Sequence, residues 1–145
     1  MKPSNLFIST EGNLVLSDFG LSRIVRAKLR GSGGTHGYMA PVKKNLCCHS
    51  LIQEVLLNKE CDVKADIWSA GVTIYKMKTK EELFLNYDED EIIVLFEDSD
   101  KVMQVLEQRL QSLPEEERNF LTWVLRWDPK ERPTADEVSA HEYFK

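Results

Sequence analysis

Two short apolar runs near the start of the chain are separated by polar residues. In the segment NLFISTEGNLVLSDF, residues 5–19, the runs flank Glu11-Gly12-Asn13. Gly12 and Asn13 tolerate a positive φ angle, which tight turns between antiparallel strands require. The segment therefore predicts a β-hairpin.

Apolar positions further along the chain follow helical spacing. The segment CDVKADIWSAGVTIYKMKT is apolar on every side from Ile67 to Met77, which is typical of a buried central helix. Between Val102 and Leu113 the apolar residues recur at i, i+3, i+4, i+8 and i+11. This spacing predicts an amphipathic helix.

Two further helix starts are indicated by local motifs. Ser-Leu-Pro-Glu at 112–115 and Thr-Ala-Asp-Glu at 134–137 have the form of capping boxes, in which side chains satisfy the first amides of a helix. They predict helices that run to Trp127 and to Phe144. The chain, residues 1–145, is therefore expected to form one mostly α-helical domain with one short β-hairpin.

Composition and charge restrict the cellular compartment and the kinds of binding partner that we expect. A net charge of −5 and an isoelectric point near 5.3 argue against nucleic acid or an anionic membrane as the main partner. Three cysteines without a CxxC pair favour free thiols in a reducing compartment. No apolar run is long enough to span a bilayer, and the start lacks the apolar core of a signal peptide. These features predict a cytoplasmic or nuclear protein with no membrane segment.

Residues 81–100 are unusually acidic and hold nine Asp or Glu side chains. A solvated face or loop is the simplest interpretation of such a run. A patch that attracts basic substrates is the alternative.

Two polar residues flank the predicted hairpin at positions suited to a metal ion. Asn5 ends the motif KPSN before the first strand, and Asp18 begins the motif DFG after the second. A hairpin brings these two positions together, and Mg²⁺ prefers one or two such protein oxygens plus phosphate oxygens. The alternative is structural, with Asn5 capping a turn and Asp18 accepting hydrogen bonds from backbone amides. The local pattern leaves both interpretations open.

Five motifs follow one another in a specific order: KPSN, DFGLSR, GTHGYMAP, DIWSAGV and RWDPKERPTADEVSAHEYF. In order and spacing they resemble the C-terminal lobe of the serine/threonine protein kinases, over nearly the whole chain. The resemblance implies a kinase C-lobe that lacks the N-lobe and the start of the catalytic loop. It also implies transfer of the γ-phosphoryl group of ATP to serine or threonine hydroxyls of protein substrates, with Mg²⁺ as the metal.

The resemblance assigns roles to five residues around the hairpin. Asn5 and Asp18 match the residues that hold Mg²⁺, and Asp18 also bridges the metal to the ATP phosphates. Lys2 matches the lysine that neutralises the transferred phosphoryl group, and Thr35 matches the threonine that helps to fix the catalytic loop. Phe7 occupies the position that forms the floor of the adenine pocket.

Three more residues receive roles from the resemblance. Asp66 matches the aspartate that ties the buried helix to the backbone of the catalytic loop. Arg132 matches the arginine that pairs with the glutamate of Ala-Pro-Glu. Ser32, three residues before Thr35, is a candidate phosphorylation site, with a solvated linker serine as the favoured alternative.

The chain departs from the family pattern at its first residue. The family's catalytic loop reads His-Arg-Asp-x-Lys-x-x-Asn, and this sequence starts at the x before Lys2. The aspartate that accepts the substrate proton and the N-lobe lysine are therefore not among these residues. We expect Met1 to be an internal residue of a longer kinase, and the 145-residue chain to be inactive and to bind ATP weakly. The alternative is a non-catalytic, pseudokinase-like module that docks protein partners. An apolar patch is expected around Trp68, where covering elements are missing.

Residues 42–53 interrupt the family pattern between GYMAP and EVLL. Without them, Glu54 would follow Pro41 directly, so we interpret 42–53 as an insertion. Looping it out costs about 2 kcal/mol. Leaving Arg132 without an acid, with Val42 in its place, costs on the order of 3–5 kcal/mol. The comparison predicts a Glu54–Arg132 ion pair beneath a loop that obstructs the substrate site.

Overall fold

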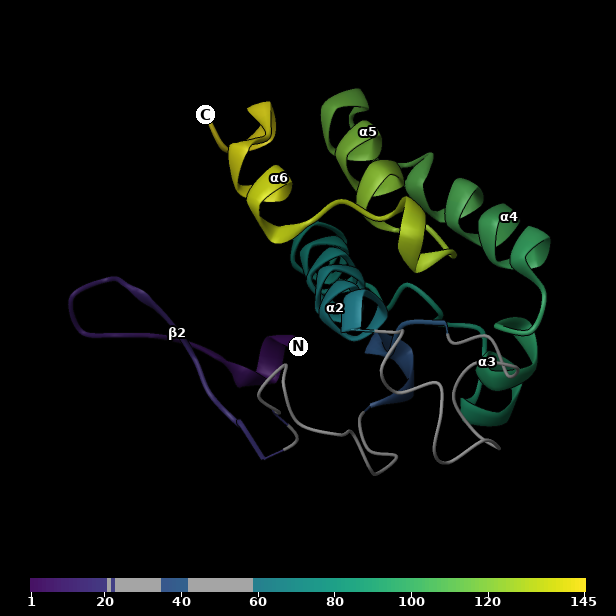
Figure 1. The fold of residues 1–145 in the computed structure, drawn as a ribbon, viewed down its shortest axis with the longest axis horizontal. Coiled ribbons are helices and arrows are strands. Elements are labelled where there is room, and N and C mark those ends of the chain that lie inside the picture. Colours follow the sequence, from purple (N-terminus) through teal and green to yellow (C-terminus); the bar gives the residue numbers. More distant parts are fainter. Residues whose placement is uncertain (21, 23–34, 42–58) are drawn as a thin grey trace.

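The computed structural model describes residues 1–20, 22, 35–41 and 59–145. In these residues the strands are β1 (Leu6–Ile8) and β2 (Leu14–Leu16), and the α-helices are α2 (Lys59–Thr79), α3 (Glu89–Leu95), α4 (Ser99–Leu110), α5 (Glu115–Val124) and α6 (Ala135–Ala140). Short 3₁₀ helices are η1 (Pro3–Asn5), η2 (His36–Tyr38), η4 (Pro129–Glu131) and η5 (Glu142–Phe144). Figure 1 shows the hairpin extending away from the helices, with α4, α5 and α6 gathered on one side of α2. The mostly α-helical fold with one short hairpin is confirmed for this part of the chain.

The predicted β-hairpin is present and short. β1 and β2 pair antiparallel, with Leu6 opposite Leu16. Gly12 takes a φ of +85°, and its amide donates to the Ser9 carbonyl at 3.0 Å. Since residues with a side chain seldom adopt this conformation, Gly12 fits the turn that the sequence indicated.

Helix α2 forms the centre of the core, but its burial is not uniform. Trp68 and Val72 are fully buried, whereas Met77 near the C-terminal end is 61% exposed. The expectation of a helix buried on every side is therefore wrong for its last turns. At Gly71 the helix approaches α5 so closely that a Cβ atom would lie 2.8 Å from Cγ1 of Val124.

The acidic segment supplies caps for two helices. Asp88 begins α3 with a capping box, in which its carboxylate accepts from the Glu91 amide at 2.8 Å and Glu91 accepts from the Asp88 amide at 2.9 Å. Asp98 caps α4 by accepting from the amides of Asp100 and Lys101. These acids therefore have local structural roles at helix N-termini, where negative charge is favourable.

The amphipathic spacing predicted α4 correctly. Val102, Leu106 and Leu110 are buried along one face of this helix. Leu113 is also buried, but it follows the end of the helix rather than extending it.

The first predicted capping box does not form. Pro114, not Ser112, precedes α5 as its N-cap and makes no side-chain cap, and the Ser112 hydroxyl instead donates to the Arg109 carbonyl at the end of α4. The helix also ends at Val124 rather than Trp127. Beyond it, the Trp127 indole donates to the Phe96 carbonyl at 3.1 Å, so that the ring packs against a distant segment.

The second predicted capping box is present. The Glu137 amide donates to the Thr134 hydroxyl, and the Glu137 carboxylate accepts from the Thr134 amide at 2.7 Å. Helix α6 ends at Ala140, before the predicted Phe144, because His141 takes an extended conformation with ψ of 147°. The last residues then form η5 and pack on α5, where Tyr143 stacks on Phe120 at a centroid distance of 4.5 Å.

Among the described residues, exposed apolar side chains gather on the hairpin and also occur on the helices, for example Val94 on α3. Trp68 is fully buried, which contradicts the expected patch. Ile8 is 76% exposed and Leu14 is 66% exposed, and their neighbours Phe7, Val15 and Leu16 are exposed as well. A two-stranded hairpin has no second layer of its own, so both faces stay open. Among the described residues, no helix is both long and apolar enough to cross a membrane.

Candidate active site

The base of the hairpin brings Asn5 and Asp18 together. Pro3 starts η1, and the Asn5 amide donates to the Lys2 carbonyl at 3.0 Å. The Ser17 amide closes the hairpin by donating to the Asn5 carbonyl at 2.8 Å. As a result, the Asn5 side-chain nitrogen lies 3.3 Å from Oδ2 of Asp18.

Asp18 has an uncommon backbone conformation, with a φ of +62°. Aspartate tolerates this left-handed region better than most residues, yet it costs on the order of 1–2 kcal/mol. Oδ1 of Asp18 accepts a long hydrogen bond of 3.4 Å from the Gly20 amide, as the structural interpretation of this residue expected. Strained residues of this kind are concentrated at functional sites.

The side chains at this site carry the types of oxygen atom that bind a magnesium ion. Asp18 provides a carboxylate and Asn5 an amide oxygen, which are the hard ligands that Mg²⁺ prefers. In the described part of the chain, no group of three or more His, Cys, Asp or Glu side chains could hold a metal. A kinase-type metal does not need such a group, because nucleotide phosphates supply much of its coordination.

Lys2 and Thr35 also meet, although they lie 33 positions apart in the sequence. The Lys2 ammonium donates to the Thr35 hydroxyl at 3.3 Å. Thr35 opens a short ordered segment, in which its carbonyl accepts from the Tyr38 amide at 2.9 Å. The contact fixes the Lys2 ammonium, and Lys2 lies only three residues before Asn5 in the sequence.

Other predicted site residues are less closely connected. Phe7, expected in the floor of the adenine pocket, is 56% exposed. Asp66 is exposed, and none of the hydrogen bonds described for residues 1–20 involves its carboxylate. The backbone amides of Asn5 and Ser17 donate to the carbonyls of Lys2 and Asn5 instead. Ser32, Glu54 and the segment 42–53 lie outside the described residues.

Arg132 is buried and bound by several carbonyl groups. Its side chain is 2% exposed, and Nε donates to the Arg126 carbonyl at 2.6 Å. The two terminal nitrogens donate to the carbonyls of Trp127 at 2.8 Å and Lys64 at 3.3 Å. The guanidinium also lies 5.1 Å from the centre of the Trp68 ring. Arg132 therefore links α2 to the segment between α5 and η4, and its expected partner Glu54 is not among the described residues.

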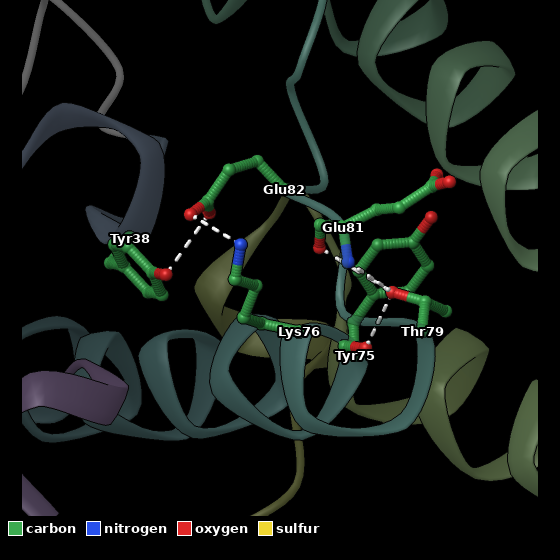
Figure 2. Close-up of polar contacts among 6 residues, drawn as sticks. All are labelled: Tyr38, Tyr75, Lys76, Thr79, Glu81 and Glu82. Carbon is green, nitrogen blue, oxygen red and sulfur yellow. Dashed lines mark hydrogen bonds and ion pairs between the residues drawn. The ribbon is translucent and has the colours of Figure 1, made fainter.

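One polar cluster near the site was not predicted from the sequence. The Tyr38 hydroxyl donates to Oε2 of Glu82 at 3.0 Å, and the Lys76 ammonium lies 2.9 Å from Oε1 of the same carboxylate (Figure 2). Burial, followed by the hydrogen bond to Glu82, raises the pKa of Tyr38 to about 12. The phenol is therefore neutral and donates at any physiological pH.

A separate hollow of about 510 Å³ lies between α4 and α5. Its walls include Leu106, Leu110 and Leu125 together with Arg118, and none of the described residues that line it precedes Met103. It is therefore not part of the site formed by the hairpin base.

Comparison with known proteins assigns the chain to a family. Residues 1–144 match the protein kinase domain family. CBL-interacting protein kinase 17 of Oryza sativa subsp. japonica is 30% identical over 151 residues, which cover 100% of this chain and 29% of that protein. Mitogen-activated protein kinase hog1 of Trichoderma harzianum is 29% identical over 171 residues, covering 100% of this chain and 45% of the relative.

A solved structure shows the same fold. The crystal structure of the Rad53 kinase domain and SCD2 superposes with a TM-score of 0.66 and 23% identity, over 100% of this chain and 48% of that one. The chain thus spans less than half the length of each of these relatives. It belongs to the eukaryotic serine/threonine protein kinase family.

Proposed function

We propose that this chain is the C-lobe part of a serine/threonine protein kinase and holds the metal-bound phosphates of ATP for transfer to a protein hydroxyl. The observation that carries the proposal is the pairing of Asn5 with Asp18 at 3.3 Å beside the Lys2–Thr35 contact. These four residues lie in three segments of the sequence. Hairpin geometry predicted that Asn5 and Asp18 meet, and the family resemblance predicted that all four share one site.

Each side chain has a definite task in this proposal. Asp18 and Asn5 would hold Mg²⁺, which neutralises phosphate charge when it is bound. The Lys2 ammonium, oriented by the Thr35 hydroxyl, would stabilise negative charge on the transferred phosphoryl group. The strained backbone of Asp18 supports a preorganised ligand rather than a flexible one.

The proposal assigns no proton acceptor to the 145 residues. Met1, Lys2, Pro3 and Ser4 precede Asn5, and none of these residues carries a carboxylate. The exposed Phe7 ring could contact one face of adenine, and none of the described residues is assigned to contact the opposite face. We therefore expect the 145-residue chain to bind Mg²⁺-ATP with millimolar affinity or weaker, which corresponds to less than about 4 kcal/mol, and to transfer no phosphoryl group by itself.

A phosphotransfer assay tests this expectation. The purified chain is incubated with radiolabelled ATP, Mg²⁺ and a basic protein substrate, beside the Asp18→Ala variant. Equal background in both samples is expected. Incorporation by the wild-type chain above that of Asp18→Ala would show that the 145 residues hold a complete catalytic site.

A second candidate function is a non-catalytic module that docks a protein partner. The observation that favours it is the open hairpin, on which Ile8 and Leu14 are largely exposed. Contiguous apolar surface of this kind is usually covered by protein. The acidic net charge and the absence of a CxxC pair support a protein partner in the cytoplasm or nucleus over a nucleic acid. If the folded 145-residue chain shows no Mg²⁺-dependent nucleotide binding at all, this docking module is favoured over the kinase C-lobe.

A further inference from the structure

The short segment 35–41 is attached to α2 through the backbone of Tyr38. The Ser69 hydroxyl on α2 lies 2.7 Å from the Tyr38 carbonyl, within hydrogen-bonding distance. Ala40 and Pro41 at the end of the segment are buried. The segment therefore has a fixed contact at its centre and a buried end, whereas Thr35 at its start is exposed.

A second attachment uses the Tyr38 side chain. Figure 2 shows the phenol pointing toward Glu82, which follows the end of α2, while Lys76 reaches the same carboxylate from the helix. The two contacts use different oxygens of Glu82, with Tyr38 at 3.0 Å from Oε2 and Lys76 at 2.9 Å from Oε1. A carboxylate bonded on both sides has a restricted orientation, so it directs the phenol as well as binding it.

The cluster contributes little to overall stability, since Glu82 and Lys76 are both partly exposed to solvent. Its effect is local. Tyr38 is bonded through its amide to the Thr35 carbonyl at 2.9 Å, and the Thr35 hydroxyl accepts from Lys2 at 3.3 Å. A continuous series of contacts thus joins Lys76 and Glu82 to Lys2 through Tyr38 and Thr35.

We propose that Lys76 and Glu82 are positioning residues, which fix Tyr38 and thereby keep Thr35 where it orients the Lys2 ammonium. The role of Lys2 in this statement rests on the proposed function, whereas the fixing of residues 35–41 does not. The chain offers a matched control in Lys78 and Glu117, an ion pair of 3.1 Å that starts from the same helix and makes no described contact with residues 35–41.

Amide hydrogen exchange by NMR tests the proposal in the 145-residue chain without nucleotide. In Glu82→Ala, exchange of the Tyr38 amide should become about tenfold faster, the effect of losing one charge-assisted hydrogen bond. Amides in α4 and α5 should keep their rates. Glu117→Ala should leave the Tyr38 amide unchanged. Glu82→Gln retains an acceptor for the phenol and should restore part of the protection.

Alkaline titration of tyrosine absorbance adds a second readout. The absorbance change of the tyrosine with a pKa of about 12 should be absent in Tyr38→Phe. In Glu82→Ala it should occur at lower pH. If Glu82→Ala does not fold, Glu82→Gln is compared with Tyr38→Phe for the same exchange pattern. Unchanged exchange at residues 35–41, or equal acceleration in Glu117→Ala, would overturn the positioning role. Absence of nucleotide binding even at Mg²⁺-ATP concentrations well above millimolar would count against the proposed function and leave these results unaffected.

Discussion

Replacing Arg132 by methionine tests how the core of this chain is held together. The side chain is 2% exposed and donates to three backbone carbonyls, those of Arg126, Trp127 and Lys64. Methionine keeps much of the apolar volume, so the change removes the donors and the charge without opening a large cavity. The three carbonyls then lose the guanidinium donors that now bind them.

The expected magnitude follows from the distances. The contacts at 2.6 and 2.8 Å are short enough for charge-assisted hydrogen bonds, each worth about 1.5–3 kcal/mol. The contact at 3.3 Å and the position over the Trp68 ring add smaller amounts. Two such bonds together lead us to expect that Arg132→Met lowers the free energy of unfolding by about 3–5 kcal/mol. Since a domain is stable by about 5–15 kcal/mol, the loss is a large fraction of the total.

Thermal and urea unfolding of the two chains measure this loss. At this chain length the melting temperature should fall by about 10 °C. Arg118→Met on α5 serves as the control, because this half-buried arginine lines the α4–α5 hollow and shares none of the carbonyls bound by Arg132. The control should change stability by about 0.5 kcal/mol or less. A loss below 1 kcal/mol for Arg132→Met, or equal losses in both variants, would refute the reasoning.

Two further predictions concern helix packing and helix capping. Gly71→Ala should cost about 1–3 kcal/mol in urea unfolding, because its Cβ atom would lie 2.8 Å from Val124 and 2.9 Å from Leu125; an unchanged midpoint would mean that α2 and α5 are not in close contact. The backbone amide of Thr134, and then its hydroxyl, hold the pKa of Glu137 below its ordinary value of 4.5. A lowered pKa in the folded state contributes stability that is complete above pH 4.5 and lost as the pH falls through the lowered value. The difference in melting temperature between the wild type and Glu137→Gln should therefore shrink between pH 6 and pH 3, and a constant difference would count against the capping box.

Local signals predicted the elements that depend on neighbouring residues. Turn residues at Gly12 marked the hairpin, and the capping box at Thr134 marked the start of α6. The motif at Ser112 failed because its hydroxyl turns back to the Arg109 carbonyl and leaves Pro114 as the N-cap. A capping motif specifies which bonds are available, whereas the preceding helix end decides which of them form.

Contacts between distant residues were harder to anticipate. The meeting of Asn5 with Asp18 followed from hairpin geometry, since both residues flank the same turn. Tyr38 and Glu82 lie 44 positions apart, and no periodicity connects them. Their contact depends on how the segment 35–41 packs on α2, which is a property of the tertiary structure. The burial of Trp68 was mispredicted for the same reason, because the sequence alone does not show which side chains cover its ring in the folded chain.

The most direct test of the account is where a metal–nucleotide complex binds. Mn²⁺ has the same preference for oxygen ligands as Mg²⁺ and broadens NMR signals of nearby amides. Titration of the 145-residue chain with Mn²⁺-ATP should broaden the amides of residues 5 and 17–19 first, and Asp18→Asn should abolish that effect. Broadening centred on the acidic start of α3 at residues 88–91, or unchanged broadening in Asp18→Asn, would contradict the assignment of Asn5 and Asp18 as the metal ligands.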